Sequence, residues 1–177
     1  QQLLLQDDCY LPGIKREIAR ISAGARLSSS CGDAEALRNG IDRPVGAAEN
    51  SWCGKCGDFV EYDFGQRQKI CSARLVFDSD LNRKGRGSVS HHWEKNILSN
   101  FPLHQPPRRP PETLVKSFRL EARQSDGTWQ EFYREDNNYQ RLVRVNFTME
   151  TDAVRLIPES TWGAEECRVF AFEIGDF

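Results

Sequence analysis

The residues with the clearest potential for chemistry are Cys53 and Cys56, which stand in a Trp-Cys-Gly-Lys-Cys sequence. A redox-active pair with this spacing needs its first thiol at the N-terminus of a helix, where the helix dipole lowers the thiol pKa. Here Gly57 and an alternating, strand-like segment follow the pair instead. The sequence therefore argues against thiol–disulfide catalysis at these two residues.

Zinc binding is a second, weak possibility for the same pair. A structural zinc site needs four thiolate or imidazole ligands, usually supplied as two close pairs. Cys31 and Cys71 stand singly, and His91 and His92 are possible further donors, so a site would combine distant segments. The six cysteines also permit disulfides, which a chain of 177 residues does not need for stability. The pattern leaves zinc-bound, disulfide and free-thiol states open. The redox compartment in which the protein lies therefore stays open as well.

The best candidate for a ligand-binding tip is the sequence His91-His92-Trp93, inside a long loop expected over residues 82–112. Sugar recognition typically stacks an aromatic ring against the sugar and adds polar hydrogen bonds. Trp162 has the same potential. For both tryptophans the alternative is a ring that only packs its loop onto the domain.

Composition and missing motifs exclude several classes of function. A net charge of −2 gives no general attraction to nucleic acid or anionic lipid, so we expect neither as a partner. No run of about 18 apolar residues is present to span a membrane. The sequence has no Gly-x-Gly-x-x-Gly after a strand, no Gly-x-Ser-x-Gly and no His-Glu-x-x-His. We therefore expect no catalytic residues in this chain.

Hydrophobic periodicity predicts the elements that must position these residues. Residues 58–64 and 71–77 alternate apolar with polar side chains, as two adjacent strands separated by Gly65 to Lys69. Later strands are expected over 118–123, 129–133, 142–149, 153–157 and 167–174. About eight short strands with turn signals between them predict an all-β, antiparallel sandwich or barrel. Its predicted core contains Val60, Tyr62, Phe64, Leu75, Phe77, Phe118 and Leu120.

One part of this pattern resembles a known family. Trp52, then residues 59–65, then Ile70 and residues 73–75 are similar to the discoidin-type, galactose-binding-like β-sandwich. The resemblance implies jelly-roll topology, with a domain over 23–177. Residues 1–22 are then expected to form a short N-terminal helical arm, the end of a preceding domain in a longer protein.

A narrower resemblance rests on residues 77–83, 161–163 and 168–174. These segments resemble the C-terminal domain of a group of bacterial FAD-dependent oxidoreductases. That resemblance implies a non-catalytic accessory domain whose partner is the catalytic domain of the parent protein, which alone would bind FAD. The alternative function is a carbohydrate-binding module that recognises a glycan through its loop aromatics.

The discoidin resemblance also implies a candidate calcium site. Residues 39–42 and 50–52 match a loop that often holds a structural calcium ion in such domains, with Asp42, backbone carbonyls of this loop and Glu173 as ligands. Arg43 stands where that family usually has glycine, and its charge is able to replace the ion. The sequence favours this ion-free version. No other cofactor is expected in this chain.

Overall fold

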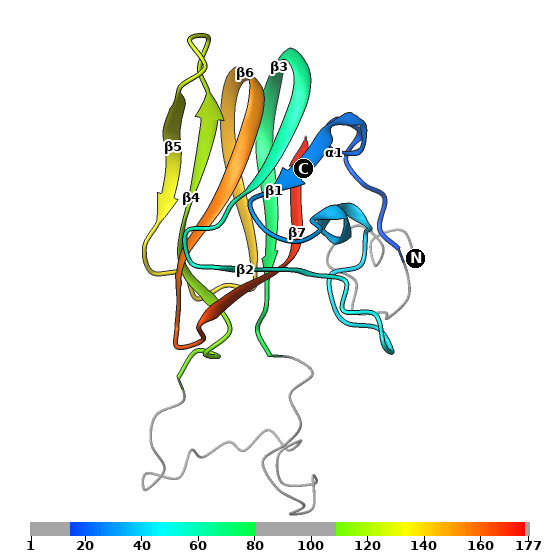
Figure 1. Cartoon of the computed structure of the whole chain (residues 1–177), viewed down its shortest axis with the longest axis vertical. Coiled ribbons are helices and arrows are strands. Elements are labelled where there is room, and N and C mark those ends of the chain that lie inside the picture. The colour runs from blue at the N-terminus through cyan, green and yellow to red at the C-terminus, as the bar shows by residue number, and fades with distance from the viewer. Residues whose placement is uncertain (1–14, 81–108, 176–177) are drawn as a thin grey trace, which may run out of the picture.

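Two antiparallel β-layers make up most of the protein in a computed structural model, which describes residues 15–80 and 109–175 (Figure 1). His91, His92 and Trp93 lie outside the described residues. The elements in chain order are helix α1 (Arg20–Gly24), strand β1 (Arg26–Ser29), 3₁₀ helix η1 (Glu35–Arg38) and strands β2 (Trp52–Lys55), β3 (Val60–Phe77), β4 (Val115–Arg123), β5 (Trp129–Glu135), β6 (Leu142–Thr161) and β7 (Glu166–Gly175). Within the described ranges, no helix has the length and apolar character that crossing a membrane requires.

The two long strands, β3 and β6, both arch from one layer to the other at the same end of the molecule (Figure 1). They pair with each other from Val60 opposite Leu156 to Val76 opposite Leu142. Their register shifts around Gly65, whose φ of 73° is a conformation that glycine adopts without strain. The sequence had predicted two strands on either side of Gly65. The structure corrects this, because β3 is one strand that pairs with β6 on both sides of the bend, and the strands predicted over 142–149 and 153–157 are likewise one strand, β6.

The arches divide the strands between two layers. The first layer has the order β1, β3, β6, β4, β5 and uses the N-terminal half of β3. The second has the order β2, β7, β3, β6 and uses the C-terminal half of β3. All of these pairings are antiparallel, which confirms the predicted all-β sandwich.

Aromatic side chains from the two layers meet in the core. Phe77 of the second layer lies 5.0 Å, between ring centroids, from Phe118 of the first. Tyr62 and Phe172 make the same kind of contact at 5.2 Å. Six of the seven predicted core side chains are fully buried, and Phe64 is half-buried because it lies beside the bend at Gly65.

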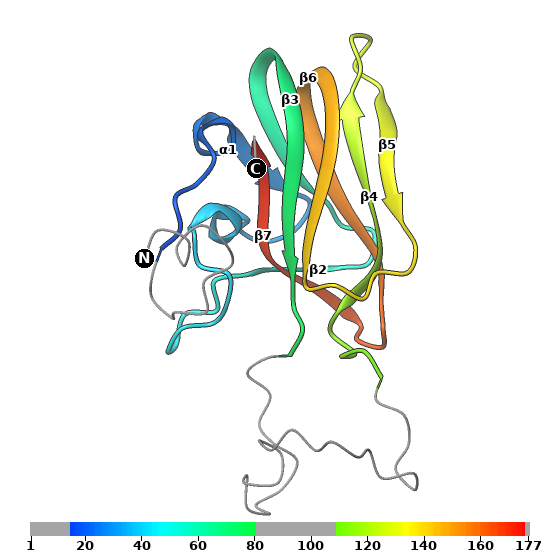
Figure 2. The same cartoon turned by 180° about the vertical axis from the view of Figure 1, so that it is seen from behind.

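Helices α1 and η1 lie against β7 on the outer face of the second layer (Figure 2). The hydroxyl of Ser22 in α1 donates a hydrogen bond to the carbonyl of Ile174 at 2.9 Å and accepts one from its amide at 2.6 Å. Both faces of β7 are consequently buried along most of its length. Helix α1 spans the arm–domain boundary that the sequence placed after residue 22. Strand β2, which the sequence did not predict, pairs with β7 at the edge of the second layer.

Candidate functional site

An exposed aromatic ring marks the end of the sandwich opposite the arches. Tyr139, in the connection between β5 and β6, is the one large hydrophobic side chain among the described residues that is exposed, at 60%. Its ring centroid lies 4.8 Å from that of Trp162, which directly follows β6, and the two ring planes are tilted by 40°. Tyr139 is therefore an exposed ring that packs against Trp162.

Hydrogen bonds and core packing fix the position of Trp162 next to Tyr139. Its indole Nε1 donates a hydrogen bond to the carbonyl of Asn138 at 2.8 Å, and its backbone amide donates one to Leu114 at 3.0 Å. The half-buried indole ring also packs against the main hydrophobic core. The packing role that the sequence left open for Trp162 is thus present, and it serves to brace an exposed neighbour.

Asn138 fixes the connection that carries Tyr139. Its side chain is buried and donates hydrogen bonds to the carbonyls of Val115 and Gln140, both at 2.9 Å. Its own backbone amide donates to the carbonyl of Lys116 at 2.8 Å. Since the residues on both sides of Tyr139 are tied down, little conformational entropy remains for a ligand to remove from this connection.

Polar groups complete what we call the aromatic platform: Tyr139, Trp162, Lys116 and Asn137. The Lys116 Nζ lies 5.0 Å from the centroid of the Trp162 ring, and the Asn137 amide donates to the Tyr139 hydroxyl at 3.3 Å. Sequence reasoning selected Trp162 and missed the other three. The available signal was an aromatic residue directly after the turn-forming sequence Asp-Asn-Asn.

The platform lies at the end of the sandwich where β3 ends and β4 begins (Figure 1). The chain between these strands contains His91, His92 and Trp93, which are outside the described residues. Their role in ligand binding stays a prediction.

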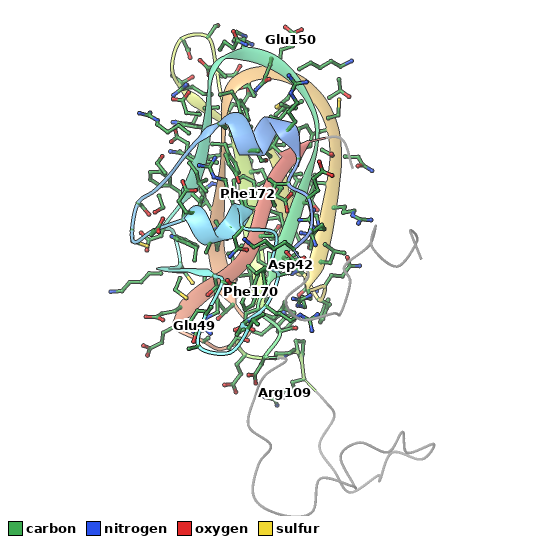
Figure 3. The ribbon with its side chains drawn as sticks, turned by 90° about the vertical axis from the view of Figure 1, so that its right-hand side faces the viewer. Asp42, Glu49, Arg109, Glu150, Phe170 and Phe172 are labelled. Carbon is green, nitrogen blue, oxygen red and sulfur yellow. The ribbon has the colours of Figure 1, made fainter. Side chains whose placement is uncertain are left out.

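The predicted calcium residues, Asp42 and Glu173, do come together. Arg74 of β3 stands directly opposite Glu173 of β7 in the strand register. Its guanidinium contacts both Asp42 carboxylate oxygens, with Nη1 at 3.3 Å from Oδ1, and it lies 3.4 Å from the Glu173 Oε1. Arg16 also pairs with Glu173, and Arg141 donates to the Asp42 carbonyl. Figure 3 shows Asp42 beside β7.

This arrangement places a guanidinium between the two predicted calcium ligands, and calcium binding there stays a prediction. Burial alone would raise the pKa of Asp42, but hydrogen bonds and charge from Arg74, with the charges of Arg16 and Arg141, lower it below its usual value. Calcium requires six to eight oxygen ligands, and no three Asp, Glu, His or Cys side chains gather around a common point in the described ranges. One Glu173 oxygen, Oε2, lacks a hydrogen-bond partner there, which alone cannot supply a coordination shell. A guanidinium from Arg74, which sequence reasoning had not selected, occupies the place between the carboxylates.

The predicted zinc pair does not converge either. Cys53 is exposed on β2, where it stands opposite Arg168 of β7. Cys56 turns toward a different partner, since its Sγ lies 3.4 Å from the Sγ of Cys167. Zinc binding at Cys53 and Cys56 stays a prediction that this geometry does not support.

Comparison with known proteins gives the fold a family likeness. No family model and no curated protein matches the chain. Among solved structures, the family 32 carbohydrate-binding module of Streptococcus pneumoniae EndoD covers 89% of this chain and 99% of its own, with a TM-score of 0.59 and 12% identity. The fold is the galactose-binding-like, discoidin-type β-sandwich.

Two further structures of this fold were solved with a sugar bound. Chitosan-binding module 2 of a Paenibacillus sp. IK-5 chitosanase/glucanase, in complex with chitotriose, covers 89% of this chain and 100% of its own (TM-score 0.58, 11% identity). The family 32 module of Clostridium perfringens NanJ, in complex with galactose, covers 89% and 97% (TM-score 0.57, 8% identity). At such identities the likeness establishes the fold alone. None of these structures supports the narrower resemblance to FAD-dependent oxidoreductases.

Proposed function

We propose that this chain is a carbohydrate-binding module that holds a sugar ring against the aromatic platform. The observation that carries the proposal is Tyr139, an exposed ring braced by Trp162. Sugar rings present C–H faces that pack on aromatic rings, and such contacts remove apolar surface from water. A rigid, exposed aromatic ring in a loop is therefore suited to a saccharide.

The polar members of the platform support a hydroxyl-rich ligand. The Lys116 ammonium group offers three hydrogen-bond donors, and the Asn137 amide offers both donors and an acceptor. The Asn137 amide contacts the Tyr139 hydroxyl, and the Lys116 ammonium lies over the neighbouring Trp162 ring, so both are near a sugar stacked on Tyr139. The sugar complexes of two similar structures support the same function.

Titration calorimetry with a panel of mono- and oligosaccharides that includes galactose and chitotriose tests the proposal. We expect micromolar to millimolar dissociation constants. Tyr139→Ala and Trp162→Ala should each weaken binding at least about tenfold, which corresponds to about 1.4 kcal/mol.

Trp129→Ala is the matched control. Trp129 begins β5 at the other end of the sandwich, where the Arg155 guanidinium lies 4.3 Å from its ring centroid. This variant removes a tryptophan without touching the platform and should keep the wild-type affinity. A panel without any binder at millimolar concentration, or unchanged affinity in Tyr139→Ala, would contradict the proposal.

An accessory role beside the catalytic domain of an FAD-dependent oxidoreductase stays a prediction from the sequence. The comparisons lend support to the carbohydrate-binding alternative instead. The same titration separates the two, because an accessory domain without a ligand of its own should bind none of the sugars.

A further inference from the structure

The turn between β2 and β3 carries an exposed thiol, and hydrogen bonds fix the backbone of this turn. Cys56 is the second residue of a turn that the Asp58 amide closes by donating to the Lys55 carbonyl at 3.0 Å. Gly57 follows with a φ of 96°, which the turn requires and which side chains other than glycine rarely adopt. The Gly57 amide donates to the Pro158 carbonyl at 2.8 Å, so the turn is also anchored to β6.

A second thiol meets Cys56 from across the sheet. Cys167 belongs to β7, stands opposite Gly54 in the strand register and is fully buried. The two Sγ atoms are 3.4 Å apart. A disulfide bond is about 2.05 Å long, so the sulfurs need to approach by about 1.3 Å, a movement that side-chain rotation at an exposed turn residue supplies.

We propose that Cys56 and Cys167 are a redox modification site, at which a low-molecular-weight disulfide such as oxidised glutathione converts the two thiols to a disulfide. This inference rests on thiol geometry and is independent of the sugar-binding platform.

The reaction balances as two thiol–disulfide exchanges. The exposed Cys56 thiolate attacks one sulfur of oxidised glutathione, forms a mixed disulfide and releases one glutathione thiolate. The Cys167 sulfur then attacks the Cys56 sulfur of the mixed disulfide, and the second glutathione leaves as a thiolate that takes up the Cys167 proton. Two protein thiols are oxidised and one glutathione disulfide is reduced to two thiols. Burial, together with the hydrogen bond and charge of Cys56, raises the pKa of Cys167, which assigns the first attack to Cys56.

Other cysteines near this corner serve as internal controls. Cys53 is exposed on β2, three residues before Cys56, but it stands opposite Arg168 of β7. The Cys31 thiol donates toward the carbonyl oxygen of Cys53 at 3.5 Å.

A bond between Cys56 and Cys167 links residues 111 positions apart. Since closing so long a loop restricts the unfolded chain, the melting temperature should rise by about 5–15 °C.

The experiment treats the full chain with oxidised glutathione, maps tryptic peptides under non-reducing conditions and records thermal melts. Lys55 lies between Cys53 and Cys56, so trypsin places these two cysteines in different peptides. We expect a peptide pair joined through Cys56 and Cys167, the loss of two of the six thiols and the rise in melting temperature.

Cys56→Ser should lose both the joined peptides and the oxidation-dependent rise, while its reduced form melts as the reduced wild type does. Cys53→Ser should retain both effects. The proposal is overturned if Cys53 is the residue joined to Cys56. It is also overturned if Cys56 carries glutathione without a bond to Cys167, or if no joined peptide forms.

Discussion

Replacing Arg74 by methionine tests the charge cluster that joins the Asp42 loop to the final strand. The Arg74 side chain is 2% exposed, and the Glu173 and Asp42 side chains that it bridges are 1% and 11% exposed. Methionine keeps much of the volume and removes the positive charge. The variant therefore leaves two largely buried carboxylates without the cation between them.

The expected loss follows from which partners remain. Removing one member of a buried ion pair typically destabilises a protein by about 3–5 kcal/mol, because the other charge stays desolvated. Glu173 retains Arg16, whereas Asp42 loses both guanidinium contacts of its carboxylate from Arg74. We therefore expect the lower end of this range, about 3 kcal/mol, or about 6–12 °C in melting temperature for a domain of this size.

Calorimetric or fluorescence-monitored melts at neutral pH measure this difference. Arg26→Met is the matched control, because the Arg26 side chain is 78% exposed and its contact with Asp63 is 3.4 Å. An exposed pair of this kind contributes about 0–1 kcal/mol, so the control should melt close to the wild type. The double variant Arg74→Met/Asp42→Asn should lose less than the sum of its single changes, since it removes the unpaired charge as well.

Two results would refute the reasoning. If Arg74→Met melts at the wild-type temperature, the cluster contributes no net stability. If calcium raises and chelator lowers the melting temperature of the wild type, the two carboxylates hold a metal ion and the guanidinium bridge is not their resting arrangement.

The remaining predictions concern acid stability and the core. Because the folded-state pKa of Asp42 is lowered, its contribution to stability is complete above the unfolded value of about 3.9 and is lost as the pH falls through the folded value. Asp42→Asn should therefore be less stable than the wild type at pH 7, and denaturant titrations should show this gap closing below about pH 4; a gap independent of pH would contradict the linkage. Phe118→Ala should lose about 3–5 kcal/mol in a urea titration, because the ring is fully buried between Phe77 and Tyr133. A loss below about 1 kcal/mol would mean that the two layers do not meet at this ring.

Period-two alternation was enough to locate most of the strands and the side chains that face the core. Alternation with a period of two is a local property, so it predicts strands over residues 60–64 and 71–77 from the sequence alone. It also places Tyr62, Phe77 and Phe118 in the core, where the structure has them. The all-β class followed, and the resemblance then pointed to the correct sandwich. Trp162 could be selected because an isolated tryptophan near a turn stands out in a polar sequence.

Contacts between distant residues could not be predicted in this way. A period of two assigns a side chain to a face but leaves the strand free to slide by steps of two residues, so register cannot be read from it. The continuity of β3 through Gly65, the position of Arg74 opposite Glu173 and the contact of Cys56 with Cys167 all depend on that register. The support of Tyr139 by Trp162 likewise brings together two connections that β6 separates along the chain. Local alternation therefore predicts which side chains share a face of a strand, whereas pairing between distant strands brings together the platform, the charge cluster and the thiol pair.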